Sequence, residues 1–304
     1  MIKIDTIYIH LTKQCNLQCD YCYFDAGKED VNELTTHELI SIINDIPILN
    51  PRRIIFTGGE PLLRNDLLDL ATEVTRINKK IVLGLTTNGI LININNSQQL
   101  VRLFDEIRIS IDGPRDINDF QRGPNSFENA MHALKCIINA GGNPSAFITA
   151  TSINIVHLKV FMKYLINQGI CKIHISPVKI VGRAKDETLL CDFKVLKNIV
   201  QEFYFEQFGL QIKSRGEESC NCGVGNYISI NPDGSVYPCH VLSYPELCIG
   251  NLRNESLHSI ILNSDLMNTP QKFNFKEISQ RSNCPLGLSV KNSCLGQYFD
   301  DKSL

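Results

Sequence analysis

The sequence lacks the features that mark membrane, exported and nucleic-acid-binding proteins. No stretch approaches the roughly 18 consecutive apolar residues of a membrane-spanning helix. The N-terminus, MIKIDTIYIHLT, has no charged region followed by a small-residue cleavage site, so it predicts a first strand rather than a signal peptide. The formal net charge is only -2, and Lys and Arg form no long run. We therefore expect a cytoplasmic protein with neither a membrane nor a nucleic acid as partner.

Cysteine, by contrast, is abundant, with 12 in 304 residues. In a reducing cytosol, clustered cysteines indicate metal binding or catalysis rather than disulfides. Three of them sit within eight residues near the N-terminus, and six lie between Cys220 and Cys294. The remaining three, Cys136, Cys171 and Cys191, fall on predicted helices or strands and are expected to be buried, inert thiols.

From residue 1 to about residue 180, short apolar runs alternate with helical patterns. Several runs are nearly all apolar, as parallel strands covered by helices tend to be. The predicted strands are 5–10, 53–56, 81–86, 106–111, 146–150 and 172–177, and the predicted helices are 35–46, 65–78, 97–104, 126–140 and 156–168. Six βα units predict an α/β fold in which a parallel sheet curls into a partial (β/α)6 TIM-like barrel. In such a barrel the chemistry lies at the carboxyl ends of the strands.

The pattern changes after about residue 185. A predicted helix, 192–208, is followed by a polar stretch and by two short apolar runs, 226–230 and 236–237. Asn-Pro-Asp-Gly joins these runs and is a strong hairpin turn signal. The tail has few long periodic runs, so a metal would have to supply part of its stability. We predict a barrel over 1–184, a helical linker over 185–219 and a small α+β domain over 220–304.

Cys15, Cys19 and Cys22 lie on one short loop directly after the first predicted strand. Three thiolates on such a loop can each bind a separate iron of a cubane cluster, and a four-iron cluster needs four ligands. The fourth iron would then be open to a small molecule. A zinc site that borrows a further ligand, such as His10 or a distant cysteine, is the alternative that the spacing leaves open.

The spacing CxxxCxxC, with the aromatic Tyr21 before the last cysteine, closely resembles the signature of the radical S-adenosylmethionine (SAM) superfamily. The similarity runs from Thr12 to Tyr23 almost residue for residue. In that family SAM chelates the open iron of a 4Fe-4S cluster, an electron from the cluster cleaves the S–C5′ bond, and the 5′-deoxyadenosyl radical abstracts a hydrogen atom from the substrate. The resemblance implies SAM and a 4Fe-4S cluster as cofactors, and an electron donor such as flavodoxin or ferredoxin.

Later strands end in segments that resemble the SAM-contacting motifs of this family. The run TGGEP at 57–61 resembles the GGE motif, whose glycines let a ligand approach the backbone and whose glutamate can accept from an ammonium. A guanidinium suits the SAM carboxylate because it donates two parallel hydrogen bonds. Taken singly, a glycine turn, a surface arginine and a packed valine are the ordinary interpretations. The resemblance implies SAM contacts for Tyr21, Gly58, Gly59, Glu60, Thr87, Asn88, Ser110, Asp112, Arg122, Asn154 and Val178.

The C-terminal cysteines and hairpin resemble the SPASM/twitch extensions of radical SAM enzymes, which hold auxiliary iron–sulfur clusters. Two four-cysteine clusters would need eight ligands, whereas this tail has six cysteines, so one auxiliary 4Fe-4S cluster is expected. Its expected ligands are Cys222, Cys239, Cys284 and Cys294, with Cys220 as the alternative to Cys222. Cys248 lies in an apolar run and is expected to pack. Zinc or free buried thiols are the alternative for the group.

The extension resembles those of enzymes that mature ribosomally made peptides by crosslinking, epimerisation or residue excision. We therefore expect a precursor peptide as the substrate. No peptide-recognition domain precedes residue 5, so a separate leader-peptide-recognition protein is expected as a partner. The residues do not indicate which group serves as acid or base. Two alternatives are a small-molecule radical SAM twitch enzyme of the dehydrogenase or heme-pathway type, and a non-catalytic zinc-binding scaffold.

Overall fold

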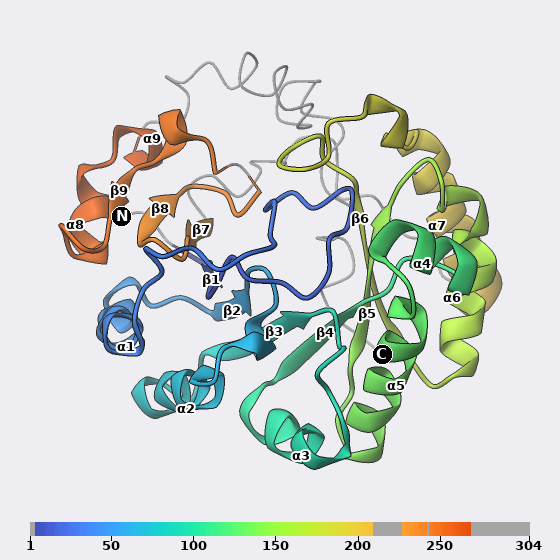
Figure 1. Cartoon of the computed structure of the whole chain (residues 1–304), viewed down its shortest axis with the longest axis horizontal. Helices are drawn as coiled ribbons and strands as arrows, with labels where there is room; N and C mark the ends of the chain where they lie inside the picture. The colour runs from blue at the N-terminus through green and yellow to red at the C-terminus, as the bar shows by residue number, and fades with distance from the viewer. Residues whose placement is uncertain (1–3, 209–226, 242, 269–304) are drawn as a thin grey trace.

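A computed structural model describes residues 4–208, 227–241 and 243–268 of the chain. Within these residues the strands form a nine-stranded sheet in the order β6-β5-β4-β3-β2-β1-β7-β8-β9 (Figure 1). The strands are β1 (Thr6–His10), β2 (Arg53–Thr57), β3 (Val82–Thr87), β4 (Glu106–Ser110), β5 (Ser145–Ala150), β6 (Lys172–Pro177), β7 (Tyr227–Ile230), β8 (Ser235–Tyr237) and β9 (Gly250–Asn251). Strands β1 to β7 pair in parallel, and β8 and β9 are antiparallel to their neighbours. The predicted α/β fold with a barrel-like parallel sheet is confirmed.

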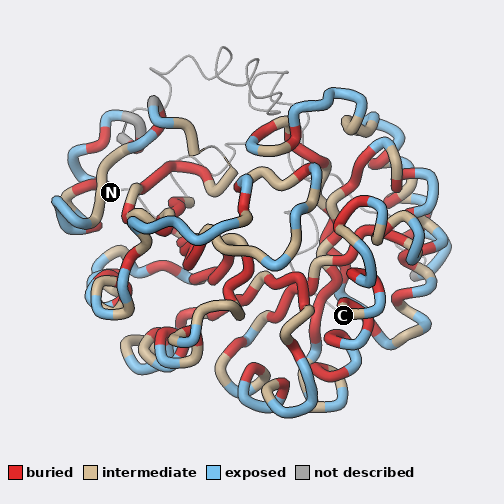
Figure 2. Tube along the Cα trace, viewed as in Figure 1, coloured by how far each residue is buried: buried red, intermediate tan, exposed pale blue. Residues whose placement is uncertain are grey.

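Helices form a layer around the outer face of this sheet (Figure 1). They are α1 (Thr36–Asp45), α2 (Leu67–Ile77), α3 (Ile94–Leu103), α4 (Arg115–Arg122), α5 (Ser126–Asn139), α6 (Leu158–Asn167), α7 (Phe193–Phe208), α8 (Leu257–Asn263) and α9 (Asp265–Asn268). In α2 the buried residues are Leu67, Leu70, Ala71 and Val74, the spacing that gives a helix one apolar face. These faces and the strands enclose one continuous core, so the buried parts of the chain follow the strands and the inner sides of the helices (Figure 2). No helix of the described ranges is long and apolar enough to span a membrane.

Helix α4 is absent from the sequence prediction because its eight residues, RDINDFQR, contain only two strongly apolar side chains. The helix nevertheless buries Asn118, Gln121 and Arg122 against the barrel. It ends at Gly123, whose φ of 117° is readily adopted by glycine. Helix α4 therefore fixes the place of Arg122, one of the predicted SAM-contacting residues, at the carboxyl end of β4.

The C-terminal hairpin continues the sheet of the barrel. Strand β7 pairs in parallel with β1, with Tyr227 opposite Thr6 and Ile230 opposite Ile9. The predicted turn between β7 and β8 is confirmed: the Gly234 N–H donates to the Asn231 carbonyl at 2.9 Å, and Gly234 has a φ of 86°. The pairing brings the residues after β8 next to the strand that carries the cysteine loop. The division of the chain at residues 184 and 219 stays a prediction, because residues 209–226 lie outside the described residues.

Candidate active site

A cavity lies at the carboxyl ends of the barrel strands, where the sequence places the chemistry. Cys15, Cys19 and Cys22 all line it, and all three are free thiols that are partly buried. The segment after β8, with His240 and Val241, lines the same cavity. The cysteine loop and the C-terminal hairpin therefore border one site.

Backbone hydrogen bonds fix the cysteine loop in place. The Cys15 N–H donates to the Gly27 carbonyl at 2.8 Å, and the Cys22 N–H donates to the Cys19 carbonyl at 3.2 Å. The loop is also held from the far side of the barrel, since the Arg183 N–H donates to the Cys22 carbonyl at 2.9 Å. These bonds use the main chain of the loop, whose three cysteines all line the cavity.

The glycines of the TGGEP turn are required by the cysteine loop itself. A Cβ atom at Gly58 would lie 2.6 Å from the Thr12 carbonyl oxygen, and one at Gly59 would lie 2.1 Å from the Gln14 carbonyl oxygen. The Gly59 N–H donates to Thr12 at 2.7 Å, and the Glu60 N–H donates to Gln14 at 2.8 Å. Only glycine permits such close contact between two backbones. The turn thus supports the loop in addition to lining the cavity.

Replacing Gly59 with alanine is therefore expected to displace the cysteine loop and to reduce the iron bound per chain after anaerobic reconstitution. The added methyl group would meet backbone atoms, which cannot move aside as a flexible side chain does. Gly27→Ala is the matched control on the cysteine loop, because no atom lies within 4 Å of a Cβ built there. Equal iron content in the two variants would contradict this role for Gly59.

The chemistry of the three thiols suits an iron–sulfur cluster. Burial raises the pKa of Cys15 and raises that of Cys19 to about 11, against the lowering effect of the nearby Arg122 charge. Metal coordination supplies the positive charge that stabilises a buried thiolate. Within the described ranges, no three His, Cys, Asp or Glu side chains are grouped to hold one metal ion. A cubane instead lets each thiolate bind a separate iron.

Glu60 lies behind the wall of the cavity. Its carboxylate is fully buried and accepts hydrogen bonds from the Thr87 hydroxyl at 2.7 Å, the Asn88 N–H at 2.8 Å and the Leu62 N–H at 3.1 Å. Burial raises its pKa, and these three donors act in the opposite direction. Glu60 thus ties the turn after β2 to the end of β3. The side-chain amide of Asn88 lies 3.9 Å from the Cys15 sulfur.

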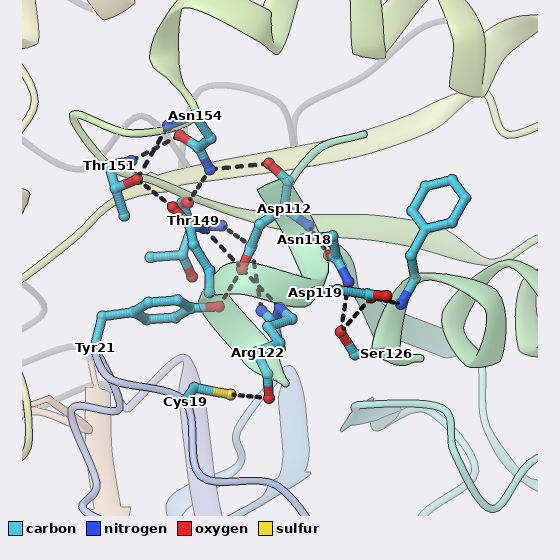
Figure 3. A network of polar contacts seen from close by, with 12 residues as sticks. Cys19, Tyr21, Asp112, Asn118, Asp119, Arg122, Ser126, Thr149, Thr151 and Asn154 are labelled. Atoms are coloured by element: carbon cyan, nitrogen blue, oxygen red, sulfur yellow. Dashed lines mark hydrogen bonds and ion pairs between the residues drawn. The ribbon is translucent and has the colours of Figure 1, made fainter. Parts of the chain in front are cut away.

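Asp112 is the centre of a buried polar network (Figure 3). The Arg122 guanidinium donates to its two oxygens, at 2.6 Å from Nε and 3.2 Å from Nη2, and the Tyr21 hydroxyl donates to it as well. The Thr149 N–H donates to Asp112 at 2.8 Å, and the Asn154 amide donates to its backbone carbonyl at 2.9 Å. The Arg122 group lies 5.6 Å from the centre of the Tyr21 ring. The network therefore joins the cysteine loop to α4, β4 and β5.

The predicted SAM-contacting residues thus fall into two groups. Those that line the cavity are Tyr21, Gly58, Gly59, Thr87, Asn88, Ser110, Arg122 and Val178. Glu60, Asp112 and Asn154 are fully buried and hold the lining residues through hydrogen bonds. Direct contact of any of them with SAM stays a prediction.

The lining residues that are not among the predicted site residues include Tyr8, Arg108, Lys179 and His240. His240 stacks on Tyr8 with ring centroids 4.1 Å apart. Burial, followed by the positive charges of Arg108 and Lys179, lowers the pKa of His240 to about 4. Strand alternation offers a signal for Arg108, because it lies two residues before Ser110 and so shares its face. Lys179 directly follows Val178, in the segment after the sixth strand that the resemblance relates to the SAM site, and no local pattern marks Tyr8 or His240.

The cysteines outside the N-terminal loop differ in how far they are buried and in whether they lie among the described residues. Cys239 is buried next to Val181, Tyr237 and Leu247, directly before the cavity residue His240. Its three expected partners, Cys222, Cys284 and Cys294, lie outside the described residues, as does Cys220. Cys136 is buried as expected and Cys191 is half-buried. The expectation of burial is wrong for Cys171 and Cys248, which are exposed because they lie in connecting segments: Cys171 directly before β6, and Cys248 directly after the short 3-10 helix Pro245–Leu247.

Comparison with known proteins agrees with this site. A sequence model of the Radical SAM superfamily matches residues 9–163, and the SPASM iron–sulfur cluster-binding domain matches residues 220–285. An AdoMet-dependent heme synthase of Oleidesulfovibrio alaskensis is 30% identical over 88% of this chain and 77% of its own length. Mycofactocin maturase MftC of Mycolicibacterium smegmatis is 27% identical over 81% of this chain and 66% of its own length. The crystal structure of Streptococcus suis SuiB bound to the precursor peptide SuiA has a TM-score of 0.76, 15% identity, and coverage of 99% of this chain and 74% of that one.

The chain belongs to the radical SAM superfamily. It is a radical SAM enzyme with a SPASM domain. Its cofactors are SAM, a 4Fe-4S cluster and auxiliary iron–sulfur clusters of the SPASM domain. The geometry of Cys15, Cys19 and Cys22, three thiols around one cavity, fits the first cluster. The alternative of a non-catalytic zinc-binding scaffold has no support from these matches.

Proposed function

We propose that this enzyme modifies a ribosomally made precursor peptide by radical chemistry, through a crosslink, an epimerisation or the excision of part of a residue. The observation that carries the proposal is the similarity to mycofactocin maturase, which spans both the barrel and the C-terminal part of this chain. The arrangement of the cavity supports it, because the segment after β8 borders the same cavity as the cysteine loop. A substrate in this cavity would contact both parts of the enzyme.

In this proposal Cys15, Cys19 and Cys22 hold the cluster that, when bound, supplies the electron for cleavage of SAM. The protein's own residues orient SAM and restrict its access to water. Arg122 is held by Asp112 before any ligand binds, and Val178, which is only 4% exposed, provides an apolar surface in the cavity. Cys239 is proposed as a ligand of one auxiliary 4Fe-4S cluster, with Cys222, Cys284 and Cys294.

Two partners belong to the same proposal. A separate small protein would bind the leader of the precursor peptide, and a flavodoxin or ferredoxin would reduce the cluster. The support for a peptide partner is the likeness to SuiB, which has been crystallised with its precursor peptide SuiA.

A second candidate function is radical chemistry on a small molecule. It is favoured by the similarity to an AdoMet-dependent heme synthase, which covers 88% of this chain at 30% identity. The two functions differ in substrate and share the cluster, SAM and the barrel.

The test is turnover by the reconstituted holoenzyme under anaerobic conditions with a chemical reductant. Each short peptide encoded beside the gene is supplied with and without any neighbouring small protein. We expect one peptide to increase the formation of 5′-deoxyadenosine and to change in mass. Cys22→Ala is the control for chemistry at the cluster. Stimulation by a porphyrin precursor, with no effect of any peptide, would contradict the proposal and favour the second candidate.

A further inference from the structure

One part of the cavity wall is basic and aromatic. Arg108, Lys179 and His240, here called the basic wall, all line the cavity, and Tyr8 lies against them. The positive charges of Arg108 and Lys179 both act on His240, and His240 stacks on Tyr8, so the four side chains are neighbours. Arg108 lies on β4 and Tyr8 on β1, whereas Lys179 follows β6 and His240 follows β8. The fold therefore brings together four residues that are distant in the sequence.

Lys179 is the unusual member of the basic wall. It is only 9% exposed, and within the part of the chain that the structure describes no carboxylate forms an ion pair with it. The described residues that line the cavity include no Asp or Glu. Lysine is rarely buried without a partner, because an ammonium group removed from water needs a compensating charge. A carboxylate of a ligand bound in the cavity would supply that charge.

The acidic groups on the neighbouring strands are already engaged. Asp112 accepts two hydrogen bonds from Arg122, and Glu60 is held by donors of β3 and of its own turn. Glu106 lies 2.7 Å from Arg108. His240 adds a further polar position, since its Nδ1 atom is buried without a hydrogen-bond partner. Lys179 and His240 thus present polar atoms to the cavity that nothing in the described wall occupies.

We propose that the basic wall binds a carboxylate of the substrate, with Lys179 as the direct ionic contact. His240 supplies a hydrogen bond, and Arg108 adds to the positive potential. The carboxylate would belong to an acidic side chain or to the C-terminus of the peptide. This inference rests on the proposed function only because it places the substrate in this cavity. It adds that the enzyme recognises a carboxylate group of that substrate. Recognition at this wall anchors the substrate near the cysteine loop.

The test is anaerobic calorimetric titration of the SAM-loaded holoenzyme with matched probes. One pair is a capped Gly-Glu-Gly tripeptide and its Gly-Gln-Gly counterpart. A second pair is Gly-Gly-Gly with a free or an amidated C-terminus, and a third is glutarate and its monoamide. In each pair only the carboxylate differs. A charge-assisted contact of this kind is expected to favour the carboxylate probe by about tenfold or more.

Lys179→Met is expected to abolish the preference for the carboxylate, and Lys179→Arg is expected to retain it. Lys172→Met is the matched control, because Lys172 is exposed at the start of β6, the strand that precedes Lys179. The pair with the larger preference identifies the source of the carboxylate. A preference confined to glutarate would support the basic wall and contradict the peptide proposal.

Three results would overturn the inference. The first is equal binding of the two members of every pair to the wild-type protein, which needs no variant and so does not depend on folding. The second is an unchanged preference in Lys179→Met. The third is a loss of iron from Lys179→Met that Lys172→Met does not show, since Lys179 would then serve an auxiliary cluster.

Discussion

Replacing Cys22 with alanine is expected to lower the rate of 5′-deoxyadenosine formation by at least about a thousandfold, since the uncatalysed reaction lacks the electron supplied through the cluster. Cys22 lines the same cavity as Cys15 and Cys19, and a cubane with two protein ligands in place of three is expected to be held weakly. The rate is measured anaerobically with dithionite, SAM and reconstituted enzyme, by quantifying 5′-deoxyadenosine. Iron per chain is measured in the same samples.

Cys171→Ala is the matched control for this experiment. Cys171 is an exposed thiol directly before β6, outside the cavity, and its sulfur has only a weak contact of 3.9 Å with the Gly169 carbonyl. We expect its iron content and its rate to equal those of the wild type. A Cys22→Ala protein that still forms 5′-deoxyadenosine at the wild-type rate would refute the assignment of the cluster to this loop.

Asp112→Ala is expected to have the largest effect on stability among the residues of the site. The substitution leaves the Arg122 guanidinium buried without its carboxylate, and it also removes the acceptor of Tyr21 and Thr149. Removing one partner of a buried ion pair costs about 3–5 kcal/mol. We therefore expect a large drop in the denaturation midpoint, measured by circular dichroism on the cluster-loaded protein. The fraction of SAM bound should fall with it, because Arg122 lines the cavity.

The exposed ion pair of Arg115 and Glu128 provides the comparison. It connects α4 and α5 near the same network, but its side chains are 59% and 51% exposed. Exposed pairs contribute less than about 1 kcal/mol, so Glu128→Ala should change the midpoint little. If the two variants lowered the midpoint equally, Asp112 would not have the structural role that its contacts indicate.

The barrel was predictable because its strands are nearly all apolar, as buried parallel strands are. The six predicted strands begin and end within one residue of β1 to β6. Helix α4 was not predictable in the same way, because it is polar and short, and tertiary contacts of Asn118 and Arg122 stabilise it. The parallel pairing of β7 with β1 depends on contacts between distant parts of the chain, which local periodicity does not report.

The cysteine loop was predictable because its spacing is local. The functions of Glu60 and Asp112 were not, because their partners lie on other strands: Glu60 bonds to the end of β3, and Asp112 bonds to α4 and β5. Lys179 and His240 meet only because the strand order places the residues after β6 and β8 around one cavity. A sequence motif identifies the cofactor site, whereas the basic wall depends on the order of the strands in the sheet.

The position of β1 between β2 and β7 has a consequence for biosynthesis. His10, at the end of the strand that leads into the cysteine loop, is hydrogen-bonded to Ser229 at 3.0 Å across 219 positions of sequence. During translation β1 therefore has one unpaired edge until the C-terminal hairpin has left the ribosome, and contacts of such long range form slowly. Completion of the sheet around the cysteine loop is thus a late event. We infer that the nascent barrel exposes a strand edge prone to aggregation until the last quarter of the chain is made.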